Sequence, residues 1–416
     1  MQKSAANWVE TMVDSAMTGA PDRDAGLIQG ILLACVPTMI VATTCAALPI
    51  LPAIIRAFPN QPHIAELVPL VAVLPTLTVA FTSIAAGVLG EKLGRRRLLI
   101  IGTAVFAVSA VMPLWLNSFV LVLLSRAVAG LAVGVMITSA VALTGDYYSG
   151  ATLQKWLAAQ GGASAIAGVL VSTASGALGE LSWRYAFLPL FIGVPLFVGL
   201  VAVPAPKVEA AHADQAVVQA DDGPAPWATW LFIFGLAIVG SAIIFPPAYE
   251  LGVLLHEKAL GSSLLTGLGV AVLAAAAAVA AFSTGALRRL PPSTKAALAI
   301  GAAGAGAILI AQATTLAPLM LGAALVGVGQ GLLGPVLSIW LLERTPDRLR
   351  GRAVGIYTTL TFLTLFVAPL IARWAAVSLQ TSSAAMRWYA IADLVVVAAL
   401  VVTMFRRPSP AIAPAD

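Results

Sequence analysis

The stretch FVLVLLSRAVAGLAVGVMITSAVALTG, from Phe119 to Gly145, contains one charged side chain, Arg126, among apolar and small residues. A transmembrane helix needs roughly 20 consecutive, mostly apolar residues, so this run is long enough to cross a bilayer. Its backbone groups would find no water in the hydrocarbon core, and only a helix or a closed β-barrel satisfies them internally. Barrel strands alternate apolar and polar residues over short segments, whereas this run is continuous. We therefore predict a transmembrane helix.

The rest of the chain has a similar composition. Hydrophobic residues make up 60% of the 416 residues and charged residues 10%, whereas charged residues are about 25% of a typical soluble protein. Twelve apolar runs are long enough to span a bilayer, at 27–56, 66–90, 96–115, 119–145, 155–179, 185–203, 227–250, 262–287, 294–314, 316–342, 352–376 and 386–405. We predict an all-α membrane protein with twelve transmembrane helices, embedded in a lipid bilayer.

The twelve runs fall into two groups of six. The segment between the groups, 204–226, is rich in Ala, Pro and acidic residues, a composition that cannot bury itself and is typical of a flexible linker. The predicted domains are a cytoplasmic N-terminal leader at 1–26, an N-terminal six-helix bundle at 27–203, a cytoplasmic linker at 204–226, a C-terminal six-helix bundle at 227–405 and a cytoplasmic tail at 406–416.

The basic residues determine the predicted orientation, because cytoplasmic loops of membrane proteins are enriched in Lys and Arg. With both termini on one side, 17 Lys and Arg residues lie on that side, 5 lie on the other, and Arg126 lies within a span. We therefore predict a multi-pass protein of the cell inner membrane with both termini in the cytoplasm. The net charge of +5 is spread over short loops without a continuous basic stripe, so we expect no nucleic-acid partner.

The two halves resemble each other at matching positions. Helix 2 leads into the loop Gly87–Arg97, and helix 8 leads into the basic loop Gly285–Leu290. Ser182–Ala186 (Ser-Trp-Arg-Tyr-Ala) enters helix 6, and Met386–Ala390 (Met-Arg-Trp-Tyr-Ala) enters helix 12. Parallel repeats of six helices are one architecture of secondary transporters, whose substrate site lies near the membrane midplane between the repeats.

The loop Gly87–Arg97, with the sequence Gly-Val-Leu-Gly-Glu-Lys-Leu-Gly-Arg-Arg-Arg, resembles a signature of the major facilitator superfamily. That signature lies between helices 2 and 3 and has the pattern Gly-x-Leu-Ala-Asp-Arg-x-Gly-Arg-Arg. Glu91 replaces the usual aspartate, and Lys92 replaces the first arginine. The resemblance extends over the chain through the helix count, the linker and the repeat. It implies two pseudo-symmetric six-helix bundles.

In that family the loop cluster latches the outward-open state, and the resemblance implies the same role here. Glycines permit close helix approach, while the carboxylate and the guanidinium groups pair with charged groups and helix ends nearby. Asp146, at the inner end of helix 4, is the implied partner of the loop. The alternative is an ordinary basic cytoplasmic loop in which Glu91 is unpaired. The implied gating residues are Gly87, Glu91, Gly94, Arg95, Arg96 and Asp146.

Arg126–Gly130 (Arg-Ala-Val-Ala-Gly) resembles the Arg-x-x-x-Gly motif in helix 4 of the drug:proton antiporters, the twelve-helix efflux branch of the family. There the arginine is linked to proton transfer or charge balance, so the resemblance implies proton coupling through Arg126. An ionised arginine in hydrocarbon is costly unless it is paired or faces water, which also favours a functional role. The alternative is that the side chain extends to the outer interface.

Asp393 in helix 12 is the second candidate for proton coupling, because carboxylates inside spans commonly serve proton relays. The alternatives are that it pairs with Arg373 or Arg387, or that it faces interfacial water. Tyr249 and Glu250 end helix 7 near the outside, and we interpret them as simple interface residues.

The fifth run departs from the antiporter pattern. Those antiporters have Gly-Pro-x-x-Gly-Gly there, whereas Val171–Gly176 is Val-Ser-Thr-Ala-Ser-Gly and keeps only the last glycine. Gly161, Gly162, Gly168 and Gly176 still form a face of small residues suited to close helix packing. The sequence therefore leaves the direction of transport open.

By the same resemblance, helices 1, 4, 7 and 10 line the transport path. The residues expected near it are Thr38, Phe245, Gln330, Trp340 and Tyr357. Such a cavity is mostly apolar and suits lipophilic or amphiphilic compounds better than sugars, which need dense hydrogen bonding. A glutamine at mid-membrane depth needs a hydrogen-bond partner, and for Gln330 the substrate and a neighbouring helix are equal alternatives.

We predict a secondary active transporter that moves a small organic, lipophilic or amphiphilic compound by alternating access, with proton-coupled efflux as the leading mechanism. Its partners would be this substrate and protons as the coupling ion, and we expect a monomer. We find no nucleophile elbow, zinc-protease helix or nucleotide-binding glycine loop, and the three histidines fall in predicted loops. The sequence thus predicts no enzyme, no cofactor and no metal site. An uptake symporter or uniporter is the alternative within transport, and a multispan receptor or membrane-embedded enzyme is the alternative from another class.

Overall fold

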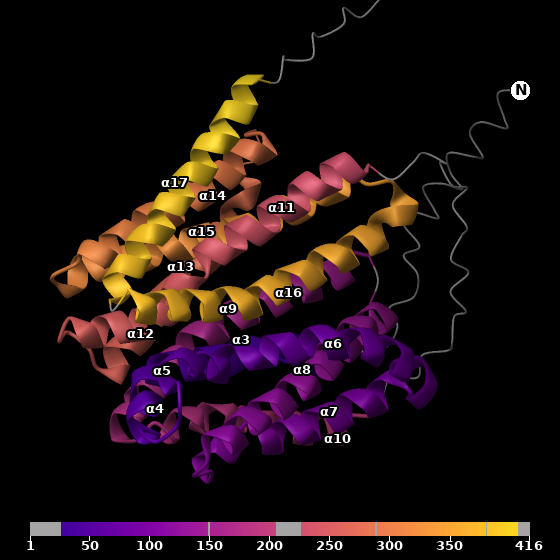
Figure 1. Cartoon of the computed structure of the whole chain (residues 1–416). Helices are drawn as coiled ribbons and strands as arrows, with labels where there is room; N and C mark the ends of the chain where they lie inside the picture. Colours follow the sequence, from indigo (N-terminus) through magenta and orange to yellow (C-terminus); the bar gives the residue numbers. More distant parts are fainter. Residues whose placement is uncertain (1–25, 149, 205–225, 288, 380, 407–416) are drawn as a thin grey trace, which may run out of the picture.

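The computed structural model describes residues 26–148, 150–204, 226–287, 289–379 and 381–406 (Figure 1). Every regular element within these ranges is a helix. Eleven helical segments are long and apolar enough to cross a membrane, and α6 (Leu70–Leu93), whose apolar part is Leu70–Ser83, supplies a twelfth crossing. The prediction of an all-α fold is confirmed for the described part of the chain.

Each half of the chain supplies six crossings. The first half contains α2 (Leu27–Cys35), α3 (Thr38–Ala47), η1 (Leu48–Ile50), α4 (Leu51–Ala57), α5 (Ile64–Leu67), α6 (Leu70–Leu93), α7 (Arg95–Ser109), η2 (Met112–Leu114), α8 (Phe119–Tyr147), α9 (Gly150–Leu181), η3 (Tyr185–Ile192) and α10 (Gly193–Ala202). The second half contains α11 (Trp227–Ile244), α12 (Pro246–Glu257), α13 (Ser263–Phe282), η4 (Ser283–Gly285), α14 (Pro292–Gln312), α15 (Leu316–Glu343), α16 (Asp347–Ser378) and α17 (Ser382–Arg406). The predicted leader, linker and tail lie almost entirely outside the described residues, so they stay predictions.

The first and the seventh crossings are interrupted helices, and proline explains the interruptions. α11 stops where Pro246 and Pro247 follow, because neither proline has an N–H with which to continue the helical hydrogen bonds. The first crossing breaks before Pro37 and again at η1, a 3-10 turn that contains Pro49. Such breaks are tolerated at membrane depth where the freed carbonyls find partners in neighbouring helices.

The helices form two bundles that follow the two halves of the sequence. In Figure 1 the indigo-to-magenta helices occupy the lower part of the molecule and the orange-to-yellow helices the upper part. In the first half, α6 and α7 pack on α8, and α3 packs on α9; in the second half, α14 packs on α15 and α17, and α13 packs on α15. The halves meet along two seams, α9 against α13 and α6 against α16.

Glycines bring helices to backbone contact both within a half and between the halves. Within the second half, a side chain on Gly331 of α15 would overlap the carbonyl oxygen of Ala277 in α13. Between the halves, a Cβ on Gly176 of α9 would lie 3.0 Å from Cα of Gly267 in α13. Small residues allow this close approach of membrane helices. The predicted small-residue face of the fifth crossing is confirmed at Gly176, whereas Gly161 has nothing within 4 Å of an added Cβ.

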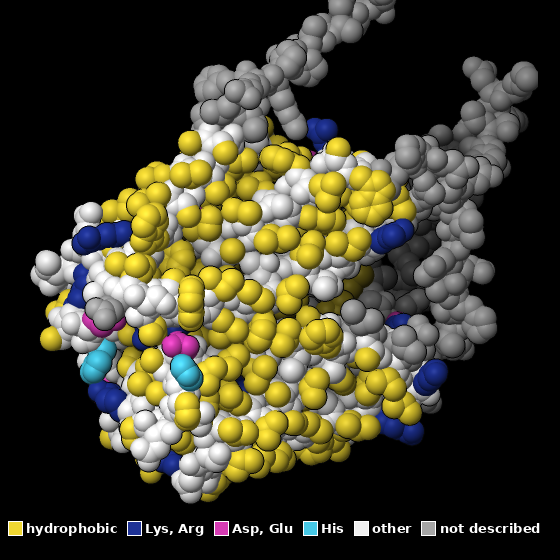
Figure 2. Space-filling view, in the orientation of Figure 1, with side chains coloured by type: hydrophobic (Ala, Val, Ile, Leu, Met, Phe, Trp, Pro, Cys, Tyr) yellow, Lys and Arg dark blue, Asp and Glu magenta, His cyan; other side chains and the backbone are white. Residues whose placement is uncertain are grey.

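The crossings begin and end at two faces of the molecule. We call the end where α11 begins and α17 ends the terminal face, and the other end, with the turns that follow α4, α12 and α16, the opposite face. Figure 2 shows hydrophobic side chains over the middle of the molecule, with Lys and Arg towards its two ends. Trp115, Trp374 and Trp388 are among the large apolar side chains that are exposed. Soluble proteins rarely expose large contiguous apolar surfaces, so this surface faces lipid and the chain is a multi-pass membrane protein.

Candidate functional site

A central cavity of about 490 Å³ lies between the two halves. Residues of α3, α6 and α9 from the first half and of α12, α13, α15 and α16 from the second half form its wall. The polar side chains of this wall are uncharged and include Thr44, Thr76, Ser164, Tyr249 and Gln330, while most of the wall is Ala, Val, Leu, Ile, Gly and Phe. No charged residue is among the described residues that line it. Its size and its apolar wall are typical of a small-molecule site.

A second cavity, of about 860 Å³, adjoins the central one on the side of the terminal face. Ser83 of α6, Thr138 of α8 and the first turns of α16 line it, and Phe362 lines both cavities. Arg352 is the charged residue among the described residues of this wall, and its guanidinium carbon lies 5.8 Å from the centre of the Trp227 ring. The central cavity therefore continues between the halves towards the terminal face.

Two of the five predicted cavity residues, Phe245 and Gln330, line the central cavity. Thr38, Trp340 and Tyr357 do not, which corrects the prediction for these three residues. Thr38 bonds to the backbone one turn back in its own crossing, whereas Trp340 and Tyr357 contact other helices of their own half. Their partners are, in the same order, the Cys35 carbonyl, the Phe232 ring and the Gly334 carbonyl.

Gln330 stabilises the break in the seventh crossing as well as lining the cavity. The N–H of Ala248 donates to Phe245, one residue closer than in a regular α-helix, which leaves the Ile244 carbonyl without its helical donor. Gln330 Nε2 donates to this carbonyl over 3.3 Å. Buried carbonyls without partners are costly. Gln330 therefore bonds to a neighbouring helix, which was one of its two predicted alternatives. Its side chain also lines the cavity.

Arg126 is wholly buried, with 0% exposure, in the middle of the first half. Its guanidinium donates to the Thr43 carbonyl of α3 over 3.1 Å and to the Ala110 carbonyl at the end of α7 over 3.4 Å, and it lies 5.2 Å from the centre of the Phe187 ring. Nε has no hydrogen-bond partner among the described residues. The alternative that Arg126 extends to an interface is wrong. Its role in proton coupling stays a prediction, because the side chain lines neither cavity.

Replacing Arg126 with lysine is expected to lower the rate of transport about tenfold while the protein still folds. Lysine keeps the charge and can reach one carbonyl, but it lacks the fork that joins α3 to α7. Losing one charge-assisted hydrogen bond costs about 1.5–3 kcal/mol, or at least about a factor of ten in an equilibrium. Flux in proteoliposomes measures the effect, and the melting temperature serves as the control for folding. Unchanged flux in Arg126→Lys would contradict a role of Arg126 in transport.

Asp393 of α17 is 1% exposed, and neither carboxylate oxygen has a hydrogen-bond partner among the described residues. Gly304 of α14 packs directly against it, since an added Cβ there would lie 2.8 Å from Asp393 Cβ. An ionised carboxylate would be unpaired in this medium, so the packing favours the neutral acid. The alternative of an ion pair with Arg373 is wrong, because Arg373 pairs with Glu250. Asp393 lines neither cavity, and its role in coupling stays a prediction.

The predicted partner of the gating loop lies where the resemblance implied. Arg95 Nη1 lies 2.6 Å from Asp146 Oδ1 and 2.8 Å from Oδ2, and both side chains are partly exposed. Arg96 donates to the carbonyls of Leu200 and Val203 at the end of α10, where a cation also complements the helix dipole. All of these bonds lie within the first half, so they hold α7, α8 and α10 together at the terminal face.

The other predicted gating residues lie at the end of α6. Gly94 ends this helix with a φ of 87°, a conformation that favours glycine, and α7 begins at the next residue. Gly87 is exposed, with nothing within 4 Å of an added Cβ. The side chain of Glu91 is outside the described part of the chain, so its place in a latch stays a prediction.

Among the residues that the structure describes, three polar contacts join the halves at the opposite face, and we call this set the outer gate. None of them was predicted from the sequence, because each joins residues that are far apart in the chain. They are Arg373 Nε donating to the Ala65 carbonyl over 2.8 Å, Arg56 Nη1 with His256 Nε2 at 3.3 Å, and the Leu264 N–H donating to Glu180 over 2.7 Å.

The interpretation of Glu250 as an interface residue is wrong. Its side chain is 1% exposed and forms an ion pair with Arg373 at 2.9 Å. The sequence contains one indication of this pair, because Glu250 and Arg373 lie at or near the ends of two apolar runs. Nothing in the sequence placed those two runs side by side.

Comparisons with known proteins agree with this architecture. The family model described as Major Facilitator Superfamily matches residues 31–315, which is more than half of the 416 residues. The model described as Sugar (and other) transporter matches residues 225–411. No curated protein matches the chain.

Solved structures of transporters share the fold over nearly the whole chain. A bacterial homolog of the human lysosomal transporter Spinster, in an inward-facing and occupied conformation, is 15% identical, with a TM-score of 0.72 over 94% of this chain and 100% of that one. The xylose transporter XylE from E. coli, inward open, is 14% identical, with a TM-score of 0.70 over 92% and 97%. The human organic anion transporter MFSD10 is 16% identical, with a TM-score of 0.61 over 92% and 100%. These solved structures share the fold of this chain, and the match of the family model over more than half of its length shows that the chain belongs to the Major Facilitator Superfamily of transporters.

Proposed function

We propose that the protein exports a small, uncharged, lipophilic or amphiphilic compound by alternating access, driven by proton antiport. The observation that carries this proposal is the central cavity between the halves, whose described wall contains no charged residue. A sugar or a nucleoside needs many hydrogen bonds to replace those it makes with water, whereas the wall offers few polar side chains. An apolar body with one or two polar groups suits it better.

The arrangement of the halves supports an inward-facing state. The predicted topology places the terminal face in the cytoplasm, and the cavities continue towards that face. The outer gate joins the halves at the other end. Two of the similar solved structures are described as inward open or inward-facing. In this state, the compound would enter the cavity from the cytoplasm or from the inner leaflet, as export requires.

The drive by protons and the gating role of the loop are parts of the same proposal. The Arg126–Gly130 motif, which resembles that of drug:proton antiporters, supports antiport. Arg126 and Asp393 are its candidate coupling residues, since both are buried and ionisable. Arg95 and Asp146, with Glu91, would latch the outward-facing state, and their pairing within the first half is compatible with that role.

Uptake of a sugar-like compound by a symporter is the second candidate. The match of residues 225–411 to the model described as Sugar (and other) transporter favours it. Uptake by such a symporter predicts hydroxyl-rich substrates, which the mostly apolar cavity wall does not favour. The choice between the two candidates is therefore a choice of substrate class, and an experiment with one probe of each class decides it.

Purified protein in proteoliposomes is expected to move a neutral amphiphile faster when a pH gradient is imposed. Radiolabelled xylose serves as the second probe, and Ala278→Trp, which fills the cavity wall, serves as the inactive control. Saturable amphiphile flux that Ala278→Trp abolishes supports the proposal. Xylose uptake without amphiphile flux overturns it in favour of the second candidate. Flux that is the same with and without the pH gradient contradicts proton coupling.

A further inference from the structure

The polar side chains in the wall of the central cavity differ in whether the protein already supplies them with a hydrogen-bond partner. Thr76 donates its hydroxyl hydrogen to the Val73 carbonyl over 2.6 Å. Ser164 donates its hydroxyl hydrogen to the Gln160 carbonyl over 2.8 Å. Each of these bonds lies within a single helix, where serine and threonine hydroxyls commonly bond to a carbonyl one turn back. Thr76 and Ser164 therefore need no partner from a bound compound.

Tyr249 and Thr44 line the same cavity with hydroxyls that are still free to bond. Tyr249 is 6% exposed, and in the part of the chain that the structure describes neither hydroxyl has a hydrogen-bond partner. The protein completely encloses other unpaired polar atoms, such as the carboxylate oxygens of Asp393, but not these two hydroxyls. A buried tyrosine hydroxyl usually has a partner. For Tyr249, the position of that partner lies in the cavity.

Gln330 contributes an acceptor to the same wall. Its amide nitrogen donates to the Ile244 carbonyl over 3.3 Å, and because a carbonyl only accepts, this bond fixes which end of the amide faces the break in the seventh crossing. The amide oxygen accepts no hydrogen bond from the described residues and is left for the cavity. The wall thus offers one acceptor, from Gln330, beside the two hydroxyls.

The three open groups lie around the break in the seventh crossing. Gln330 bonds to the last residue of α11, and Tyr249 is in the first turn of α12. Tyr249 also interacts electrostatically with Cys45, the neighbour of Thr44 on α3. Interrupted helices commonly form the substrate sites of secondary transporters. We call Thr44, Tyr249 and Gln330 the polar patch of the otherwise mostly apolar cavity.

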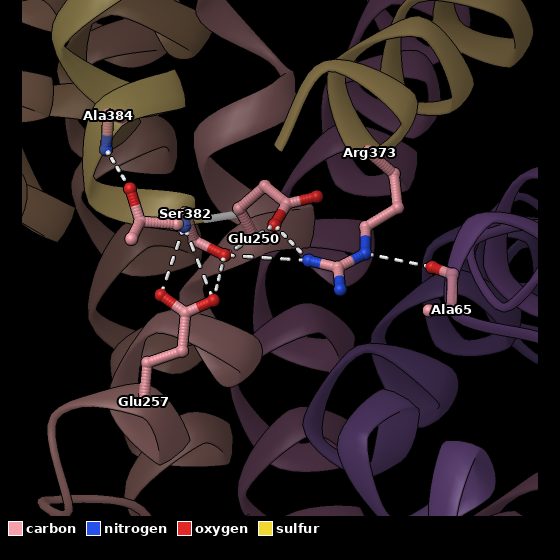
Figure 3. A network of polar contacts seen from close by, with 7 residues as sticks. Ala65, Glu250, Glu257, Arg373, Ser382 and Ala384 are labelled. Atoms are coloured by element: carbon pink, nitrogen blue, oxygen red, sulfur yellow. Dashed lines mark hydrogen bonds and ion pairs between the residues drawn. The ribbon is translucent and has the colours of Figure 1, made fainter. Parts of the chain in front are cut away.

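The charged residue next to Tyr249 holds the tyrosine in this position. Glu250 follows Tyr249 on α12 and forms the buried ion pair with Arg373. Figure 3 shows Glu250 beside Arg373 and Ser382. Successive side chains on an α-helix point about 100° apart. The ion pair therefore fixes α12 with Glu250 towards α16 and Tyr249 towards the cavity, and the polar patch itself carries no charge.

We propose that the polar patch binds one neutral group of the exported compound that both accepts and donates a hydrogen bond, namely a hydroxyl or an amide. Tyr249 donates to the oxygen of this group, and the hydrogen of the group goes to the amide oxygen of Gln330. Thr44 lies on the other half and offers a second hydroxyl to the same group. The rest of the compound packs against the apolar wall. This inference rests on the proposed function and narrows its substrate class.

Other groups fit the polar patch less well. An ether or an ester accepts from Tyr249 but has no hydrogen for Gln330, so the amide oxygen is left without a partner in the complex. A buried polar group without a partner lowers affinity, because it has lost its bonds to water. A cationic amine finds no counter-charge in the described wall, and an unpaired buried charge is expensive. The polar patch therefore selects hydroxyl and amide compounds.

Three compounds with the same apolar body test the proposal on the purified full chain. Thymol has a hydroxyl, thymol methyl ether accepts but cannot donate, and para-cymene does neither. Saturable binding of the radiolabelled compounds is measured, and Ala278→Trp, which fills the cavity wall, sets the background. The parent is expected to bind thymol about tenfold more tightly than the ether, because the ether cannot donate to Gln330.

Tyr249→Phe removes the hydroxyl and keeps the ring. Its affinity for thymol is expected to fall about tenfold, because phenylalanine cannot donate. Its affinity for para-cymene and its melting temperature should stay those of the parent, since the hydroxyl has no partner among the described residues whose loss would destabilise the fold. Tyr357→Phe is the matched control, because that hydroxyl donates to the Gly334 carbonyl and lines neither cavity. Its affinity for thymol should equal that of the parent.

The outcomes separate the polar patch from the proposed function. Equal affinity of Tyr249→Phe and the parent for thymol overturns the polar patch, and so does an equal loss of affinity for thymol and para-cymene. A parent that binds all three compounds alike keeps the proposed export of amphiphiles and overturns the polar patch. Saturable binding of none of them contradicts both. Thymol binding that depends on Tyr249, without flux of thymol in proteoliposomes, contradicts export and leaves the polar patch standing.

Discussion

Replacing Gly331 with valine is expected to prevent the recovery of folded protein. Gly331 lies where α15 crosses α13, and an added Cβ would overlap the carbonyl oxygen of Ala277 and lie 2.7 Å from its Cα. These are backbone atoms of a helix in the same bundle, so no change of rotamer relieves the clash. Overpacking costs typically about 1–3 kcal/mol, and more where backbones have to shift. The yield of monodisperse protein in detergent and its melting temperature measure the loss.

Gly334→Val is the matched control, because it makes the same change on the same helix where nothing lies within 4 Å of an added Cβ. Its yield and melting temperature should stay close to those of the parent. If both variants lose stability equally, valine in a helix is the cause and the crossing with α13 is not. If Gly331→Val melts like the parent, α13 and α15 do not meet as the structure has them.

The crossings were predictable because a bilayer imposes a length and a composition on every segment that spans it. The breaks at Pro246 and Pro49 follow from the missing N–H of proline. The pair of Arg95 and Asp146 was predictable for another reason. Both residues flank crossings at the same face, and the loop motif has a fixed place in the family.

The cavity wall was only partly predictable, because hydropathy identifies a span but not its rotation about its own axis. Apart from Gln330, Ser338 and the terminal Glu343, α15 consists of apolar or small residues, so the sequence did not show that Gln330 meets the cavity while Trp340 turns towards Phe232. The ion pair of Glu250 and Arg373 was even less predictable from the sequence than the cavity wall, because it depends on tertiary structure. Its residues are 123 positions apart, and only the packing of α12 on α16 brings them together.

Replacing Gly176 with leucine is expected to abolish transport while leaving the protein folded. Gly176 lies in the seam between the halves, where an added Cβ would be 2.6 Å from the Ser263 carbonyl oxygen and 3.0 Å from Gly267 Cα. Added Cβ atoms come as close to neighbouring backbone atoms at several glycines within a single bundle. Here, however, the two helices belong to different halves, which separate in the transport cycle. Leucine therefore blocks closure at the opposite face and traps the outward-facing state. The distance between spin labels at Asn60 and Thr314, two exposed positions at the opposite face in different halves, should increase, and flux should be absent.

Gly161→Leu is the control for this second glycine, since it adds the same side chain to α9 where nothing lies within 4 Å of an added Cβ. Gly161 lines the central cavity, so leucine there should reduce flux by filling space while the distance across the gate stays that of the parent. Loss of flux in both variants with a longer distance only in Gly176→Leu identifies the seam as the part that moves. If Gly176→Leu instead fails to fold, as expected for Gly331→Val, then α9 and α13 are a fixed contact. The halves would then have to part along α6 and α16, and the outer gate at Arg373 and Ala65 would be the place to look for the motion.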